Sequence, residues 1–212
     1  MESPVLKLEV PYTMLVSGQT GSGKSWFVRK LLQNQEAMHD KPFERIIYAY
    51  SVDQPLYREI QQEVPMVEFS LGLPEDLGLD GRNTLLCLDD LMLELQSSKK
   101  LASFFTRMRH ENLSTIFIVQ NLFFKSTLAT TINRNSQYMA IFPNMRDSFM
   151  ISVLGRQIYP TEKDFIVTAF REATAKPFGY LFLDLKTTSD SRLRVRTGIF
   201  PGDFLTIFRP KP

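Results

Sequence analysis

The stretch LVSGQTGSGKSW, residues 15–26, decides the fold, because it sets a glycine-rich turn between an apolar run and a segment with helical pattern. Its spacing is one glycine, four residues, and then Gly23-Lys24-Ser25. Glycines at this spacing let backbone N–H groups approach nucleotide phosphates, and the following helix adds its positive N-terminal end. The stretch therefore predicts a strand, a phosphate-binding loop and a helix, in that order.

Two polar residues at the end of this loop have expected partners. Lys24 is expected to reach the β- and γ-phosphates of a nucleoside triphosphate, and Ser25 to place its hydroxyl on Mg²⁺. The alternative is a glycine-rich turn with a chance Lys-Ser pair, which the strand before it and the helix after it disfavour. The nucleotide-binding residues are predicted to be Gly18, Gln19, Thr20, Gly21, Ser22, Gly23, Lys24, Ser25 and Trp26.

Short apolar runs alternate along the chain with longer segments of helical pattern. The apolar runs span residues 12–17, 45–51, 66–70, 83–90, 114–121 and 137–142, and the helix candidates span 24–34, 55–63, 97–109, 125–132, 146–154 and 161–171. This alternation predicts a mostly parallel, doubly wound sheet flanked by helices, and together with the phosphate-binding loop it predicts an α/β fold of the P-loop NTPase class.

The C-terminal part departs from this alternation. Two apolar segments, 178–186 and 192–200, predict an antiparallel hairpin on one edge of the sheet, and Pro201-Gly202 is expected to end regular structure. Ahead of them, Thr161 is expected to cap the last helix, with Asp164 bonding back to it.

Length and composition limit the alternatives further. A chain of 212 residues predicts a single domain over 1–212, with a core at about 12–171 and a hairpin and tail at about 178–212. Its one cysteine, Cys87, lies in an apolar run and is expected to be a core thiol in a reducing, intracellular setting. No run approaches the roughly 18 apolar residues of a membrane-spanning helix, so no membrane partner is expected.

Charge does not identify a partner by itself. The net charge is +2, although residues 171–212 hold eight Lys and Arg against four Asp and Glu, a surplus of four positive charges. Ordinary scatter of solvated charge and a phosphate-contacting surface both remain open.

Two adjacent acids follow an apolar run in TLLCLDDLM, residues 84–92. At the carboxyl end of a parallel strand, Asp89 would reach Mg²⁺ through water beside Ser25. Asp90 would then orient and deprotonate an attacking water, which favours hydrolysis over transfer to an acceptor, although aspartate reaches less far than glutamate. The alternative is a turn that caps the next helix.

The run STIFIVQN, residues 114–121, also ends on polar side chains. Gln120 at this tip is a candidate γ-phosphate sensor, and the alternative is an ordinary turn residue. Just before it lie Arg107 and Arg109, at the end of a helix candidate. They would either complement the helix dipole or act as an arginine finger on the site of a neighbouring subunit.

Four segments carry a resemblance to a known family. They are GQTGSGKS (18–25), LLCLDDLM (85–92), TIFIVQNLF (115–123) and TTINRNSQYMAIFPNMRDSFMISVLGRQIYP (130–160). Together they resemble the viral genome-packaging ATPases of the FtsK–HerA superfamily, of the Polinton and adintovirus type, over about residues 12–200. The first two motifs are generic, whereas the last two are far more diagnostic.

The resemblance implies a site and a setting. It implies that Lys24 and Ser25 bind ATP and Mg²⁺, that Asp89 and Asp90 form the second acidic motif, and that Gln120 is the sensor. It also implies an arginine acting in trans, for which the candidates are Arg107 and Arg109, and a less defined role for Arg146. The implied fold is of the additional-strand type.

The implied assembly is a homo-oligomeric ring, pentameric or hexameric, with double-stranded DNA in its pore. Its partners would be DNA of any sequence and a capsid or portal-vertex protein. It would act inside the infected host cell, in a viral factory or the nucleus, and transiently at the virion vertex.

Contacts to DNA phosphates are expected from Lys125 and from Arg192, Arg194 and Arg196, which alternate along one predicted strand. Arginines on an exposed edge strand also prevent sheet aggregation, which is the alternative.

Three other functions remain open: a conjugation or segregation pump of the same superfamily, a small-molecule or nucleotide kinase, and a scaffold that binds nucleotide and scarcely hydrolyses it.

Overall fold

The computed structural model describes residues 5–97, 112–122, 127–145 and 148–210 of the chain. Its strands are β1 (Thr13–Ser17), β2 (Arg45–Tyr50), β3 (Val67–Leu71), β4 (Thr84–Asp89), β5 (Leu113–Val119), β6 (Tyr138–Ile141), β7 (Leu181–Asp184), β8 (Val195–Thr197) and β9 (Thr206–Phe208). Its helices are α1 (Lys24–Gln33), α2 (Gln35–Met38), α3 (Pro55–Glu63), α4 (Met92–Ser97), α6 (Thr127–Asn135), α7 (Ser148–Ile158) and α8 (Phe165–Ala173).

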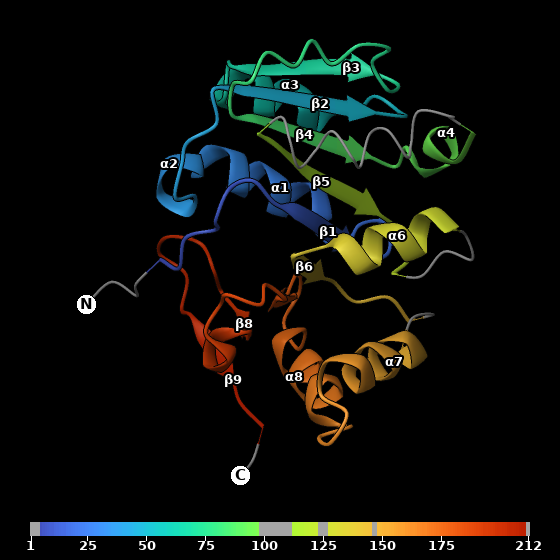
Figure 1. Ribbon diagram of the computed structural model, residues 1–212, viewed down its shortest axis with the longest axis vertical. Helices are drawn as coiled ribbons and strands as arrows, with labels where there is room; N and C mark the ends of the chain where they lie inside the picture. Colours follow the sequence, from blue (N-terminus) through green and yellow to red (C-terminus); the bar gives the residue numbers. More distant parts are fainter. Residues whose placement is uncertain (1–4, 98–111, 123–126, 146–147, 211–212) are drawn as a thin grey trace.

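These strands form one sheet in the order β3-β2-β4-β5-β1-β6-β7-β8-β9 (Figure 1). The pairs from β3 to β6 are parallel, and those from β6 to β9 are antiparallel. Strand β5 lies between β1, which leads into the glycine-rich loop, and β4, which ends at Asp89. This intervening β5 is the additional strand. The predicted α/β P-loop NTPase fold with an additional strand and C-terminal antiparallel strands is confirmed.

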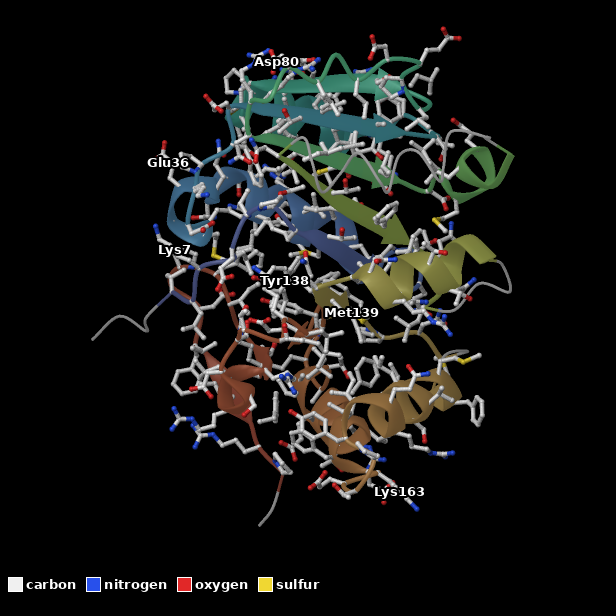
Figure 2. All side chains as sticks on the ribbon, viewed as in Figure 1. Lys7, Glu36, Asp80, Tyr138, Met139 and Lys163 are labelled. Carbon is white, nitrogen blue, oxygen red and sulfur yellow. The ribbon has the colours of Figure 1, made fainter. Side chains whose placement is uncertain are left out.

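Helices cover both faces of the sheet, because alternate residues of its strands point to opposite sides. One apolar cluster joins β1 to α1 and α3, and the other joins β1 to α4, α6, α7 and α8. On β6, the neighbours Tyr138 and Met139 belong to different clusters, and both lie inside the molecule in Figure 2. Cys87 is buried in the first cluster, as expected.

Some helix boundaries differ from the predicted ones. A short helix that was not predicted, α4, spans Met92–Ser97, and the helix expected over 97–109 falls almost entirely outside the described residues. The cap expected at Thr161 is wrong: α8 has Asp164 as its N-cap and begins at Phe165. The Thr161 hydroxyl instead donates to the Glu162 carboxylate at 2.6 Å. A local hydroxyl–carboxylate bond replaces the predicted cap.

The C-terminal strands differ in two ways from expectation. The hairpin is present as β7 and β8, but β9 extends the sheet beyond Pro201-Gly202. The three arginines do not share a strand face: Arg192 lies in a 3₁₀ turn, Ser191–Leu193, and only Arg196 lies within β8. Arg196 is buried and pairs with Asp184 at 3.5 Å. Strand β8 pairs on both sides, so it is not an edge strand.

Among the described residues, no helix has both the length and the apolar character that crossing a bilayer requires.

A buried histidine links the N-terminal segment to α2. His39 Nδ1 lies 2.8 Å from the carbonyl oxygen of Gln35, and Nε2 lies 3.0 Å from the Tyr12 hydroxyl oxygen. A carbonyl only accepts, so Nδ1 donates and the neutral Nε2 accepts from Tyr12. Burial lowers the pKa of His39 from 6.5 to about 4, against smaller opposing effects of Gln35 and Asp40.

We expect this histidine to make stability fall on acidification. The unfolded chain takes up a proton near pH 6.5, whereas folded His39 does so only near pH 4, so its contribution is complete above pH 6.5 and is lost toward pH 4. The loss between pH 7.5 and pH 5 is about 2 kcal/mol. Urea unfolding should show a shallower pH dependence for His39→Gln. Equal dependence in both proteins contradicts this account.

Candidate nucleotide-binding site

A tight loop, residues 18–23, joins β1 to α1 and requires glycine at two positions. At Gly18, a Cβ atom would lie 2.5 Å from Cβ of Phe142 and 2.8 Å from Oγ of Ser22, so a side chain would collide. At Gly23, the N-cap of α1, φ is 107°, a left-handed backbone that strains other residues. The glycine spacing of the sequence therefore dictates this turn.

Hydrogen bonds tie the loop to the sheet. The N–H of Gly18 donates to the carbonyl of Val119 at 3.2 Å, and that of Gln19 to the carbonyl of Pro143 at 3.4 Å. Lys24 opens α1, and its Nζ donates to the carbonyls of Gly18 at 2.7 Å and Gln19 at 3.0 Å. The ammonium is thus held over the loop, at the carboxyl ends of the strands.

The polar side chains of the loop differ in their fit to an anion. The Oγ of Ser22 is buried and has no hydrogen-bond partner within the described part of the chain. Burial lowers the pKa of Lys24, and the charges of Asp89 and Asp90 oppose this shift. A phosphate oxygen accepts hydrogen bonds from an ammonium group, so Lys24, which lines the cleft described below, fits a phosphate, whereas the Ser22 hydroxyl does not line it.

Asp89 ends β4 in a buried position between two tyrosines. It is 7% exposed, and its Oδ2 accepts from the hydroxyls of Tyr48 at 2.8 Å and Tyr57 at 3.1 Å. Burial raises the pKa of Asp89, while the two tyrosines and Lys24 lower it. Because both tyrosines donate to Oδ2, Oδ1 keeps its acceptor capacity as far as the described residues extend.

Asp90 and Gln120 are in direct contact. The Nε2 of Gln120 donates to Oδ2 of Asp90 at 3.0 Å, and the N–H of Asp90 donates to the carbonyl of Ile118 at 3.1 Å. Asp90 is exposed and has φ of 57°, which is uncommon for a residue with a side chain. The backbone turns here so that the second acid leaves the sheet and meets the amide from the next strand.

These side chains share a cleft of about 490 Å³ at the carboxyl edge of the sheet. Of the predicted residues, it is lined by Thr20, Gly21, Gly23, Lys24, Ser25, Trp26, Asp89, Asp90 and Gln120. Gly18, Gln19 and Ser22 belong to the loop but do not line the cleft. The strand tips predicted to meet therefore do meet.

The donor set of the cleft fits a magnesium ion bound together with phosphates. Mg²⁺ uses one or two protein oxygens and takes its other ligands from phosphates and water. Ser25 and Asp89 line the same cleft and supply a hydroxyl and a carboxylate. Within the described residues, no group of three or more His, Cys, Asp or Glu could hold a metal alone.

Trp26 lines the cleft, and Arg29 packs against its ring. Its ring is 57% exposed, and the guanidinium carbon of Arg29 lies 4.5 Å from the ring centroid. Arg29 forms ion pairs with Glu59, at 2.6 Å, and with Glu63, both on α3. The helix that follows the loop is thereby connected to the helix that carries Tyr57.

Sequence reasoning missed three residues of this site: Tyr48, Tyr57 and Phe178. Tyr48 and Tyr50 alternate along β2, and Tyr50 lies opposite Asp89 in the parallel register, so two tyrosines in a buried strand were an available signal. Tyr57 and Phe178 lie in segments with no comparable pattern. Phe178 lines the cleft.

Several predicted residues lie outside the described residues: Arg107, Arg109, Lys125 and Arg146.

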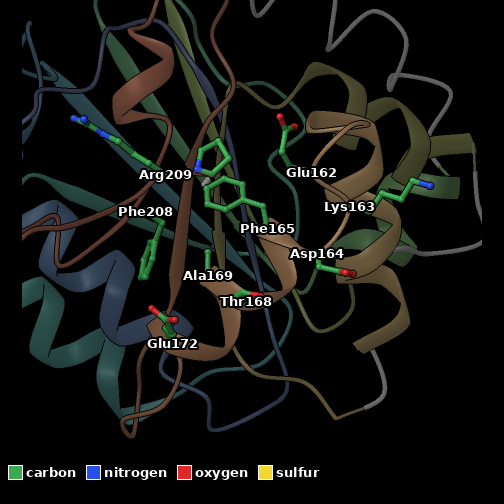
Figure 3. A pocket seen from close by; sticks show the side chains of 10 residues that line it. Glu162, Lys163, Asp164, Phe165, Thr168, Ala169, Glu172, Phe208 and Arg209 are labelled. Carbon is green, nitrogen blue, oxygen red and sulfur yellow. The ribbon is translucent and has the colours of Figure 1, made fainter. Parts of the chain in front are cut away.

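A second cavity, of about 520 Å³, lies between the start of α8 and the C-terminal segment (Figure 3). Phe165 and Phe208 form part of its wall, and charged side chains from Glu162 to Asp164 lie on its rim. None of the predicted site residues lines it.

The fold is similar to that of the genome packaging NTPase B204 from Sulfolobus turreted icosahedral virus 2. Its structure with AMP gives a TM-score of 0.53 at 14% identity, covering 84% of this chain and 95% of that chain. Its structure with ATP-gammaS gives 0.52 at 12% identity, covering 95% and 98%. The sequence matches no family model and no curated protein. At these identities the similarity establishes the fold.

Removing one tyrosine hydroxyl should raise the pKa of Asp89 further. Tyr48→Phe deletes a donor to the charged carboxylate, so the protonated form gains relative stability. Titration of the ¹³C carboxyl shift of Asp89 measures this. Tyr50→Phe is the control, because this ring contacts Tyr57, and among the described residues the Tyr50 hydroxyl makes no hydrogen bond to Asp89. An unchanged Asp89 pKa in Tyr48→Phe contradicts the assignment.

Proposed function

We propose that this protein is an ATP-hydrolysing motor that moves double-stranded DNA into a viral capsid. The observation that carries the proposal is the single cleft that holds Lys24, Ser25, Asp89, Asp90 and Gln120 at one sheet edge. A phosphate loop alone serves kinases, switches and hydrolases. A second acid in contact with a polar strand tip favours hydrolysis of a triphosphate over transfer to an acceptor.

Each residue has a distinct role in this proposal. The loop and Lys24 bind the β- and γ-phosphates, which replace the loop carbonyls as partners of the ammonium. Ser25 and Asp89 would hold Mg²⁺, which supplies charge neutralisation between the phosphates. Asp90 accepts a proton from the attacking water, and Gln120 orients that water and keeps Asp90 in place.

The comparison supports the packaging role in particular. The similar structures are those of a viral genome packaging NTPase, solved with AMP, with sulfate and with ATP-gammaS. In two of these comparisons the aligned region covers 95% of this chain and 98% of that chain, so the similarity extends well beyond the phosphate loop. That NTPase was solved with AMP and with ATP-gammaS, which supports nucleotide binding by this chain.

The proposed assembly is a homo-oligomeric ring, pentameric or hexameric, that completes each site with a neighbour's arginine. Arg107 and Arg109 are the candidates for that arginine. DNA is contacted through its phosphates, without regard to sequence, and the ring docks on a capsid or portal-vertex protein. The ring works inside the infected cell, in a viral factory or the nucleus, and transiently at the virion vertex.

The chain contains one tryptophan, Trp26, and it lines the cleft, so its fluorescence reports on binding there. Adding Mg-ATP should change the Trp26 emission, and the change should level off as the binding site fills. Lys24→Ala should weaken the affinity by about 10- to 100-fold, the loss expected for hydrogen bonds to a charged group. Lys30→Ala is the control, because Lys30 lies on the same helix and pairs with Asp203. Equal affinities in all three proteins contradict the site.

Asp90→Asn should separate binding from turnover. Phosphate release should fall by about 10²- to 10⁴-fold, because the proton acceptor is lost, while Mg-ATP binding is retained. Asp76→Asn, an exposed turn residue bonded to the Gly78 N–H, is the control. Unchanged turnover in Asp90→Asn indicates a scaffold that binds nucleotide without using this acid.

The same assay tests the motor. Duplex DNA should stimulate phosphate release, and a small admixture of Asp90→Asn should suppress the stimulated rate more than in proportion, because neighbouring subunits are coupled. Proportional suppression contradicts a coupled ring. Transfer of the γ-phosphate to a nucleoside identifies a kinase instead.

A further inference from the structure

An aromatic residue that the proposed chemistry does not use stands over the phosphate loop. Phe178 is 67% exposed and lines the cleft together with Lys24 and Trp26. Its ring reaches the end of the loop: a Cβ built on Gly23 would lie 3.2 Å from Cδ1 of Phe178. A large apolar ring is thus presented to solvent beside the phosphate-binding groups.

The backbone at Phe178 is unfavourable for this residue type. Its φ is 60°, in the left-handed region that glycine adopts without strain and phenylalanine does not. The exposed ring gains little from burial that would offset this strain. Folding alone would therefore favour glycine here, so the presence of a phenylalanine indicates that its ring has a use within the cleft.

The segment that carries the ring is firmly anchored. Gly179 approaches α8 so closely that a Cβ would lie 2.4 Å from the carbonyl oxygen of Ala173. The ring of Tyr180 packs at 4.9 Å between centroids against Phe27 of α1 and at 5.5 Å against Phe142. Since α1 also carries Lys24, Phe178 keeps a fixed position relative to the phosphate loop.

Strand order defines which part of a nucleotide reaches this ring. Asp89 ends β4 and Gln120 follows β5, both on one side of β1, whereas Phe178 lies just before β7, on the other side beyond β6. The terminal phosphate belongs beside the acids. The opposite end of the molecule, its base, therefore extends toward β6 and β7, where Phe178 stands.

We propose that Phe178 is the stacking platform for the base of the bound nucleoside triphosphate, and that it favours a purine. This inference rests on the nucleotide site proposed above. A base presents a flat, weakly hydrated face, and stacking on an aromatic ring is the contact that suits it. A purine covers more of the ring than a pyrimidine does. Trp26 is less suited, because Arg29 already stacks on its ring.

Calorimetric titration of Phe178→Gly with Mg-ATP, Mg-UTP and inorganic tripolyphosphate tests the proposal. Affinity for ATP should fall about 10-fold, as for the loss of one base–aromatic stack, and the preference for ATP over UTP should shrink. Affinity for tripolyphosphate should stay unchanged, because it has no base. Thermal unfolding should show the variant to be no less stable than the wild type, since glycine relieves the backbone strain.

Two further variants sharpen the test. Phe178→Tyr keeps the ring and should retain ATP affinity, whereas Phe204→Ala removes an exposed ring outside the cleft and should change nothing. Unchanged ATP affinity in Phe178→Gly overturns the proposal, and so does an equal loss for ATP and tripolyphosphate, which would indicate an effect on the loop. A wild type that binds neither ligand overturns the nucleotide site itself.

Discussion

The register of three parallel strands is the constraint on which the rest of the site depends. Ser17 at the end of β1 lies opposite Val119 of β5, and Asp89 at the end of β4 lies opposite Ile118 of β5. The three strands therefore end at one level of the sheet. A shift of one residue in either pairing would turn the terminal side chains to the other face of the sheet. Because apolar side chains fill both faces, such a shift would also bury the wrong residues, and the core thereby fixes the site.

The second constraint on the site is the burial of Asp89. A carboxylate at this depth is stable only with donors around it, and Tyr48 and Tyr57 supply them from a strand and a helix. Tyr57 belongs to α3, which is also joined to α1 through Arg29. Ion pairs thus join α1 to α3, and hydrogen bonds join α3 and β2 to the end of β4.

Much of this arrangement could be predicted from the sequence, because local patterns determine it. Each of the six parallel strands contains the core of an apolar run, and the glycine spacing specifies the loop. Apart from the local bond that replaces the Thr161 cap, the errors concern features decided by tertiary contacts. Arg196 alternates with Arg194 in sequence, but pairing on both sides of β8 and the charge of Asp184 bury it. Phe178 occupies a left-handed backbone position that no periodicity reveals, and only packing against α8 and α1 places it at the cleft.

A crystal structure with Mg²⁺ and a non-hydrolysable ATP analogue tests the central claim most directly. Our account places the γ-phosphate within hydrogen-bond distance of Lys24 Nζ, with the metal between Ser25 and Asp89 and with Gln120 facing the position of the attacking water. Lys24 then exchanges the carbonyls of Gly18 and Gln19 for phosphate oxygens. An analogue bound elsewhere, or a triphosphate in the cleft with Asp89 remote from its metal, would contradict the account.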